Sequence, residues 1–149
     1  MRGDDRGLEG LPLQLLIVMI VVGFTVPAVY AGLASSERGQ LDLRVRAAVQ
    51  RVVAAAQAFY LAGGGSDVVE VDLSGLLTVS VDYVVFGGPG GNASLVRYRL
   101  TGEPERFVLA EHPSVPMAAR DGGPLALGSG RYRVLVEAAA GDFVRLSVV

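Results

Sequence analysis

The sequence has no cysteine and a single histidine, His112. Without cysteine, disulfides, thiolate metal sites and a cysteine nucleophile are excluded. One histidine also makes histidine-rich metal sites and most general-base arrangements hard to build. The net charge is −2, and the basic residues are all arginine and scattered, so a nucleic-acid footprint is absent. We expect no cofactor and no enzymatic activity, and a fold held together by packing alone.

An uninterrupted apolar run, residues 11–33, contains no charged side chain. As an α-helix it would be about 35 Å long, enough to cross a bilayer core of about 30 Å. A secretory signal peptide usually has a shorter apolar region, and a helix buried in a soluble core is usually interrupted by polar positions. We therefore predict a transmembrane or filament-core helix at residues 8–34.

A short charged leader, MRGDDRGLEG, precedes this run and contains Arg6-Gly7 and then Gly10. In this layout the N-terminus resembles the type IV prepilin family, most closely its archaeal members, the pilins and archaellins. In that family a membrane-embedded aspartyl peptidase removes the leader after a glycine that follows a basic residue. The resemblance implies cleavage of the Gly7–Leu8 bond, with residues 1–7 as the leader and cleavage after Gly10 as the second choice. An ordinary signal anchor is the alternative.

The sequence departs from that family in one respect. Many members carry a glutamate about five residues into the mature chain, which pairs with a neighbouring subunit, whereas here Glu9 lies earlier and Gln14 is uncharged.

The arginines that flank the apolar run slightly favour an external N-terminus. The leader resemblance and the glycosylation signal described below nevertheless place the N-terminus in the cytoplasm.

Two prolines lie in the apolar segment. Pro12 is expected in the first turn, where its missing N–H costs little, and would mark the helix start. Pro27 falls in the helix interior and predicts a kink or a locally melted turn near residues 23–27. In lipid, neighbouring helices or Thr25 must satisfy the freed carbonyl groups, which favours a packed, multi-subunit setting.

Residues 35–65 predict an amphipathic helix followed by a linker. Apolar side chains recur at three- and four-residue spacing, and the segment is rich in good helix formers. These apolar positions are Leu41, Val45, Val49, Val52, Ala56 and Phe59. Asp42, Arg46 and Arg51 form the charged face, and Gly63-Gly64-Gly65 should end the helix. We expect one long helix that continues from the membrane segment.

Residues 66–149 predict a β head. Segments rich in β-branched and aromatic residues alternate with turns rich in glycine and proline. The predicted strands are residues 68–73, 77–81, 83–86, 95–100, 107–110, 132–137 and 143–149. The last two should form a hairpin. The predicted fold class is α+β, a long hydrophobic-to-amphipathic N-terminal helix followed by an antiparallel β-sandwich-like head.

Candidate chemistry in this head is sparse. The glycine-rich stretch 87–91 resembles a phosphate-binding loop in composition, but no helix follows it, so a hairpin tip is the better interpretation. Glu111-His112, near Asp121, could form an acid–base or metal pair, yet the neighbouring prolines indicate an exposed loop. Glu70 and Asp72 alternate along one strand and should lie on its solvated face. We predict no catalytic, cofactor-binding or metal residue.

One modification signal is present. Asn92-Ala93-Ser94 is an N-x-S acceptor for N-glycosylation in a glycine-rich loop, with Asn92 as the acceptor and Ser94 as the hydroxyl residue.

These observations favour a type IV pilin-like structural subunit of an extracellular filament. The resemblance implies a membrane-inserted precursor that a prepilin peptidase processes, and an assembly machinery that packs the N-terminal helices of many copies together. The expected partners are therefore other copies of the chain, the peptidase, the assembly machinery and the membrane before assembly, with no nucleic acid. The alternative is a monotopic membrane-anchored extracytoplasmic binding domain that stays monomeric.

Overall fold

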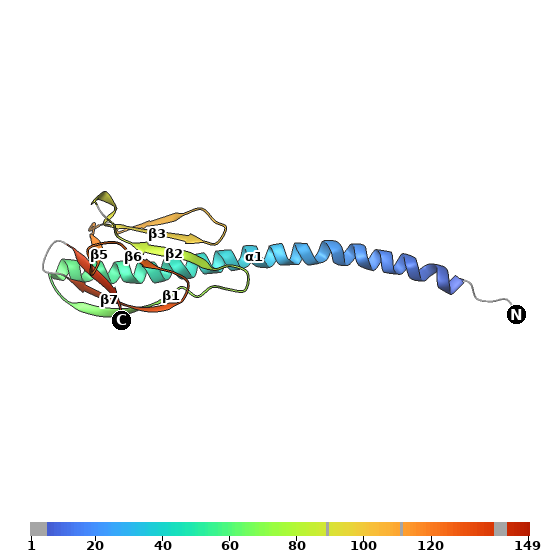
Figure 1. The fold of residues 1–149 in the computed structure, drawn as a ribbon, viewed down its shortest axis with the longest axis horizontal. Coiled ribbons are helices and arrows are strands. Elements are labelled where there is room, and N and C mark those ends of the chain that lie inside the picture. Colours follow the sequence, from blue (N-terminus) through green and yellow to red (C-terminus); the bar gives the residue numbers. More distant parts are fainter. Residues whose placement is uncertain (1–5, 89, 111, 139–142) are drawn as a thin grey trace. The chain divides into compact units, whose positions relative to one another are not determined.

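The computed structural model describes residues 6–88, 90–110, 112–138 and 143–149, with the backbone alone for residues 6–11. One long helix, α1 (Arg6–Ala62), is followed by two β-sheets (Figure 1). The fold is α+β with a sandwich-like head, as the sequence predicts. The chain divides into two compact units, with the boundary between Ser36 and Glu37. The amphipathic part of α1 therefore belongs to the same unit as the β head.

The start of α1 differs from the prediction. The helix begins at Arg6, and Pro12 lies inside it rather than at its first turn. Proline lacks the N–H that would bond the carbonyl of the fourth preceding residue, here Leu8, so the loss is confined to one bond close to the helix end. The prediction of one long helix is confirmed, because α1 is continuous through Pro27 and Gly39.

The glycines after α1 end the helix, as predicted. Gly63 has a φ of 66°, a left-handed conformation that glycine adopts without a Cβ penalty. The amide of Gly64 donates to the carbonyl of Phe59 at 3.2 Å, and the amide of Gly63 donates to the carbonyl of Tyr60 at 3.3 Å. This pair of bonds is the Schellman arrangement, which satisfies two carbonyl groups at the helix end.

The head contains two four-stranded sheets, in the orders β1-β7-β8-β5 and β4-β3-β2-β6. The strands are β1 (Ser66–Asp72), β2 (Val81–Phe86), β3 (Leu95–Leu100), β4 (Arg106–Leu109), β5 (Met117–Ala119), β6 (Leu125–Leu127), β7 (Arg131–Ala138) and β8 (Val144–Val148). All neighbouring strands are antiparallel except β5 and β8, which are parallel. The predicted hairpin of β7 and β8 is confirmed, while its turn, residues 139–142, lies outside the described residues.

The strand prediction fails in two places. The strand predicted at residues 77–81 is wrong except for Val81, which begins β2, because residues 77–80 form a loop in which the amide of Leu76 donates to the carbonyl of Val79 at 2.7 Å. The short strands β5 and β6 lack a local signal, since three residues are too few to show alternation. Their pairing with β8 and β2 is decided by the tertiary fold.

One hydrophobic core joins the second half of α1 to both sheets. The helix contributes the side chains that the sequence assigned to its apolar face, and Ala48 and Val53 extend this face. The buried helix residues are Leu41, Val45, Ala48, Val49, Val52, Val53 and Ala56. Inward-facing residues of β2, β3, β7 and β8 form most of the rest of the core, with Val71 of β1, Met117 of β5, Leu127 of β6 and several loop residues, and Figure 1 shows this part of α1 alongside the strands. Helix and head therefore fold as one body from Glu37 onward.

Candidate membrane segment and the attachment of the helix to the head

The first part of α1 exposes its apolar side chains. Phe24 is 77% exposed and Met19 is 71% exposed. The other exposed large side chains here are Leu13, Leu15, Leu16, Ile17, Val18, Ile20, Val21, Val22, Val26, Val29, Tyr30 and Leu33. Among the described residues, α1 is the one helix long and apolar enough to cross a membrane, and none of its most apolar stretch is buried. Such a surface fits membrane insertion or a signal sequence.

The residues of the predicted processing site lie at the start of α1. Arg6, Gly7, Leu8 and Gly10 are within the helical backbone, and residues 1–5 of the leader lie outside the described residues. A protease binds its substrate in an extended form, so this end of the helix would unwind for cleavage. Gly7 and Gly10 favour unwinding, because glycine weakens a helix by about 1 kcal/mol relative to alanine. Cleavage at Gly7–Leu8 stays a prediction.

The backbone stays helical at Pro27, so the expected melted turn does not occur. Whether the helix bends there stays a prediction. Within the first unit, a Cβ atom added to Gly23 or Gly32 would meet nothing within 4 Å. The helix surface is therefore open beside both glycines.

Glu37, the first residue of the second unit, is held by a head loop. Its Oε2 accepts a hydrogen bond from the amide of Thr78 at 2.8 Å and another from the Thr78 hydroxyl at 2.5 Å. The Thr78 hydroxyl, followed by the amide, lowers the pKa of the Glu37 carboxyl from its ordinary value of 4.5. One turn of α1 is thus tied to the loop between β1 and β2.

A second attachment involves a buried tyrosine. Tyr98 of β3 is 0% exposed, and its hydroxyl donates to Oδ1 of Asp42 at 2.7 Å. Oδ2 of Asp42 lies 2.7 Å from Nη1 of Arg106 of β4, and the two side chains form an ion pair. Burial, and then the bond to Asp42, raise the pKa of Tyr98, while the hydrogen bond to Tyr98 raises the pKa of Arg46. Asp42 and Arg46, predicted as a charged face, therefore fasten α1 to the sheet β4-β3-β2-β6.

The sequence does not predict this attachment directly. The available signal was Tyr98 itself, because a tyrosine at an inward position of an alternating strand needs a partner for its hydroxyl. Arg38 adds a weaker contact, with its Nε 3.6 Å from Oε1 of Glu103. These contacts lie in the first turns after the unit boundary, and near the end of α1 Nε2 of Gln57 donates to the carbonyl of Pro113 at 3.3 Å.

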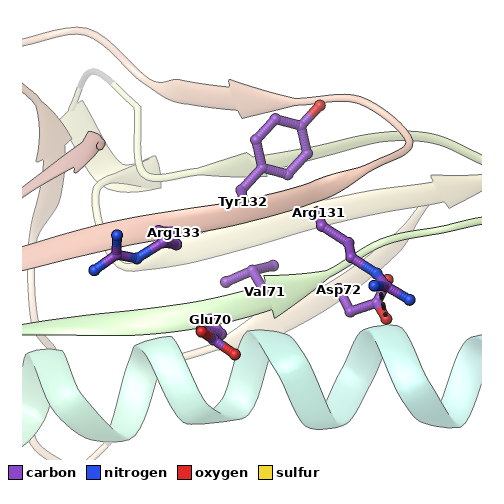
Figure 2. Close-up of a pocket in the computed structure, with 6 residues that line it drawn as sticks. All are labelled: Glu70, Val71, Asp72, Arg131, Tyr132 and Arg133. Carbon is purple, nitrogen blue, oxygen red and sulfur yellow. Dashed lines mark ion pairs between the residues drawn. The ribbon is translucent and has the colours of Figure 1, made fainter.

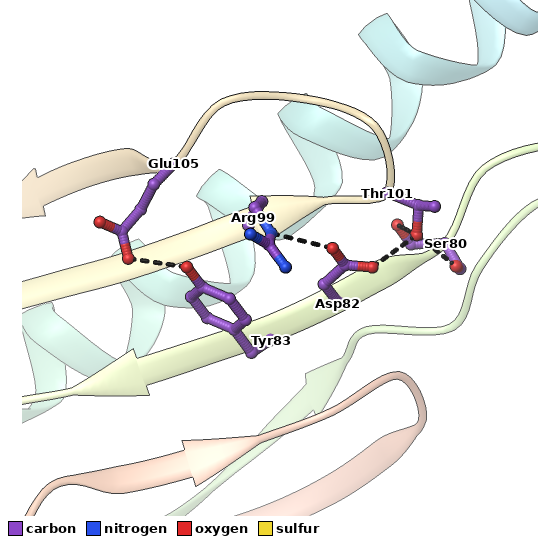
Figure 3. Close-up of polar contacts among 6 residues, drawn as sticks. All are labelled: Ser80, Asp82, Tyr83, Arg99, Thr101 and Glu105. Carbon is purple, nitrogen blue, oxygen red and sulfur yellow. Dashed lines mark hydrogen bonds and ion pairs between the residues drawn. The ribbon is translucent and has the colours of Figure 1, made fainter.

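A polar cluster covers the outer surface of β2 and β3 (Figure 3). Asp82 accepts hydrogen bonds from the Thr101 hydroxyl at 2.7 Å and from Nε of Arg99 at 2.9 Å, which lower its pKa in that order. Tyr83 donates to Glu105 at 2.8 Å, which raises the pKa of Tyr83, and Arg99 lies 5.1 Å from the centre of the Tyr83 ring. These groups bind one another, an arrangement that stabilises the hairpin.

A shallow depression of about 550 Å³ lies over β1 and β7 (Figure 2). Its walls combine the carboxylates Glu70 and Asp72 with Arg131 and Arg133 of the neighbouring strand, and Arg131 lies 3.4 Å from Asp72. Glu70 and Asp72 lie on one outward-facing side of β1, as predicted. Hydrogen bonds from Ser74 lower the pKa of Asp72, with a smaller effect of Arg131. Opposite charges on adjacent strands are an ordinary cross-strand arrangement.

The glycosylation candidate lies in the connection between β2 and β3. Asn92 is exposed at the end of the short 3₁₀ turn Gly90–Asn92, and the hydroxyl of Ser94 is 2.7 Å from that of Ser114. The base of this hairpin loop packs on β5, since a Cβ on Gly87 would lie 1.9 Å from the carbonyl oxygen of Met117. The side-chain amide of Asn92 is accessible because the residue is exposed, and its glycosylation stays a prediction.

The remaining candidates come from the segment before β5. His112 is exposed, and Glu111 lies outside the described residues. Within the described ranges, no group of three or more histidine, cysteine, aspartate or glutamate residues is placed to hold a metal ion.

Comparison with known proteins gave no match: no family model, no curated protein and no solved structure is significantly similar to this chain.

Proposed function

We propose that this chain is a type IV pilin-like structural subunit, which is inserted in a membrane as a precursor and then assembled into an extracellular filament. The observation that carries the proposal is the division of α1. Its first part exposes an uncharged apolar surface, and its second part is built into the core of a β head. A helix of this kind can pack with its copies at one end while it carries a folded head at the other.

Two further features support assembly rather than a passive tether. Gly23 and Gly32 leave open space beside the backbone, which is the room that small residues give to a neighbouring helix in a membrane or filament core. The attachments through Glu37 and Asp42 fix the head to its own helix. Each copy would therefore carry its head on the second part of its own α1.

The proposed partners are copies of the chain, a prepilin peptidase and an assembly machinery, with the membrane as the setting before assembly. The peptidase would act on the cytoplasmic side and leave Leu8 as the first residue. The head would then face the exterior, where Asn92 is available for a glycan. We propose a structural role without an enzymatic activity or cofactor.

The test is the mass of the mature protein. Intact-mass analysis of protein purified from native membranes or filaments should show a chain that begins at Leu8. Gly7→Val should block processing, because the residue before the cut bond must be small. Gly3→Val is the matched control, since Arg2-Gly3 is the same dipeptide in the same leader. Protein that retains residues 1–7 would overturn the proposal and leave a membrane-tethered head.

A further inference from the structure

The strand β4, drawn in orange in Figure 1, is the end strand of its sheet, so one of its edges pairs with no described strand. The amide of Ala110, directly after β4, donates to the carbonyl of Ser94 at 3.0 Å. In antiparallel pairing, such hydrogen-bonded pairs alternate with pairs that exchange no bond. The register of β4 with β3 places Phe107 and Leu109 in the unbonded pairs. Their amide and carbonyl groups therefore point away from β3, along the free edge.

The side chains of the same two residues are exposed. Phe107 is 55% exposed and Leu109 is 57% exposed. Among the described strands, the other large apolar side chain in this exposed class is Val148 of β8, at 49%. The free edge of β4 thus combines unpaired backbone groups with apolar side chains, which is the combination that allows another strand to be added.

The other described sheet edges are protected by devices that natural proteins use against strand addition. The edge strand β1 carries charged residues, and the carboxylate of Asp67 accepts a hydrogen bond from the amide of Val68 at 2.8 Å. In β5, the amides of Met117 and Ala119 donate to loop carbonyl groups. The strand β6 has only three residues and directly follows a proline. In β4, the charged residue Arg106 is held in an ion pair with α1 and does not protect the edge.

We propose that the free edge of β4 is a docking site for β4 of a second copy of this chain. The strand is complementary to an antiparallel copy of itself, with Phe107 opposite Leu109 of the second copy and Val108 opposite its own counterpart. The outward backbone groups of Phe107 and Leu109 then bond each other, and each of these side chains meets an apolar partner. A shift of two residues would instead pair Leu109 with Glu105, so the apolar pattern sets the register.

The size and symmetry of this contact decide where it forms. Stable interfaces involve about 20–30 residues on each side, whereas β4 offers residues 107–109, so isolated heads stay apart in dilute solution. Copies that are held together at an effective concentration in the millimolar range can pair. A two-fold contact closes on itself, so it joins two heads side by side and is not the repeating contact of a filament. The inference thus goes beyond the proposed function and depends on the head alone.

The absence of cysteine allows disulfide mapping in the full-length protein. Val108→Cys places a thiol at the two-fold centre, where the facing Cα atoms would lie about 4.5 Å apart, within the range of about 4.4–6.8 Å that a disulfide spans. Val148→Cys is the matched control, because Val148 is exposed whereas Val108 is partly buried against the core, so random collisions favour position 148. Both variants are oxidised with copper phenanthroline in detergent at about 1 mM protein, and dimers are measured on a non-reducing gel.

The inference predicts a several-fold higher dimer fraction at position 108 than at position 148. Adding Leu109→Arg to Val108→Cys should remove this dimer without changing the circular dichroism spectrum, because Leu109 is exposed. A dimer fraction at position 108 that is no higher than at position 148, or that survives Leu109→Arg, would overturn the proposal.

A second measurement tests the register at two exposed positions. Phe107→Cys is mixed with a mass-tagged Leu109→Cys chain and oxidised in the same way. The mixed disulfide should exceed the 107–107 and 109–109 disulfides, since only the mixed pair lies directly opposite. A mixture without this excess would also overturn the proposal. Neither result affects the mass of the mature chain, which tests the proposed function separately.

Discussion

Removal of the Tyr98 hydroxyl should destabilise the head. Tyr98→Phe keeps the buried ring and deletes the bond to Asp42, whose side chain is 15% exposed, together with the contact of the hydroxyl with Arg46. A hydrogen bond to a charged group contributes about 1.5–3 kcal/mol, and Asp42 keeps its ion pair with Arg106, so we expect a loss near the lower end, about 1.5 kcal/mol. With a urea m value of about 1–3 kcal/mol/M, the unfolding midpoint should fall by about 0.5–1.5 M.

The assay is urea unfolding of a fragment that begins at Glu37, the boundary of the second unit. This fragment lacks the apolar run and should be soluble, monomeric and rich in β structure by circular dichroism. Tyr83→Phe is the matched control, because Tyr83 also donates to a carboxylate, that of Glu105, but at the protein surface. Its midpoint should move less than that of Tyr98→Phe, with an unchanged m value in both variants.

A double-mutant cycle separates the bond from other effects of the substitution. If the bond to Asp42 causes the loss, Tyr98→Phe should cost less in an Asp42→Asn background than in the unaltered fragment, since paired residues couple by about 0.5–3 kcal/mol. Equal midpoints for Tyr98→Phe and Tyr83→Phe, or the absence of coupling to Asp42, would refute the view that this buried bond fastens α1 to the head.

Two further predictions concern the helix. Pro27→Ala should leave membrane insertion and leader cleavage intact but lower the yield of sheared filament relative to the membrane pool. The reason is that a changed helix shape would disturb the packing of every subunit in the filament. An unchanged ratio of filament to membrane protein would argue for a simple tether. The lowered pKa of Glu37 means that its bonds to Thr78 contribute stability above pH 4.5, and this contribution is lost as the pH falls through the lower pKa of the folded state. The difference in urea midpoint between the unaltered fragment and Glu37→Gln should therefore shrink below pH 4.5, and a difference independent of pH would contradict the assignment.

Much of the helix could be predicted because its signals are local. The apolar run, the spacing of Leu41, Val45 and Val49, and the glycines after Ala62 each report a helix and its buried face without reference to the rest of the chain. The longer strands could also be predicted locally, because apolar and polar side chains alternate over enough residues in β3 and β7. The start of α1 at Arg6 differs from the prediction because proline is an ordinary start signal of a helix, yet the loss of one bond near a helix end is tolerated.

Some of the candidate functional residues could likewise be predicted from the sequence, and others could not. The apolar segment, the Arg6-Gly7 pair and the Asn92 acceptor are visible as sequence patterns. The roles of Asp42 and Glu37 are not, because each depends on a partner distant in the chain.

The sequence by itself determined one helix, with an exposed apolar half and an amphipathic half, and a head of β strands, since side-chain periodicity acts over a few residues. Only the tertiary structure decided the pairing of β5 with β8, the loop at residues 77–80 and the burial of the Tyr98 hydroxyl against Asp42. The physical reason is that these features depend on contacts between segments far apart in the chain, and such contacts leave no periodic trace in either segment alone.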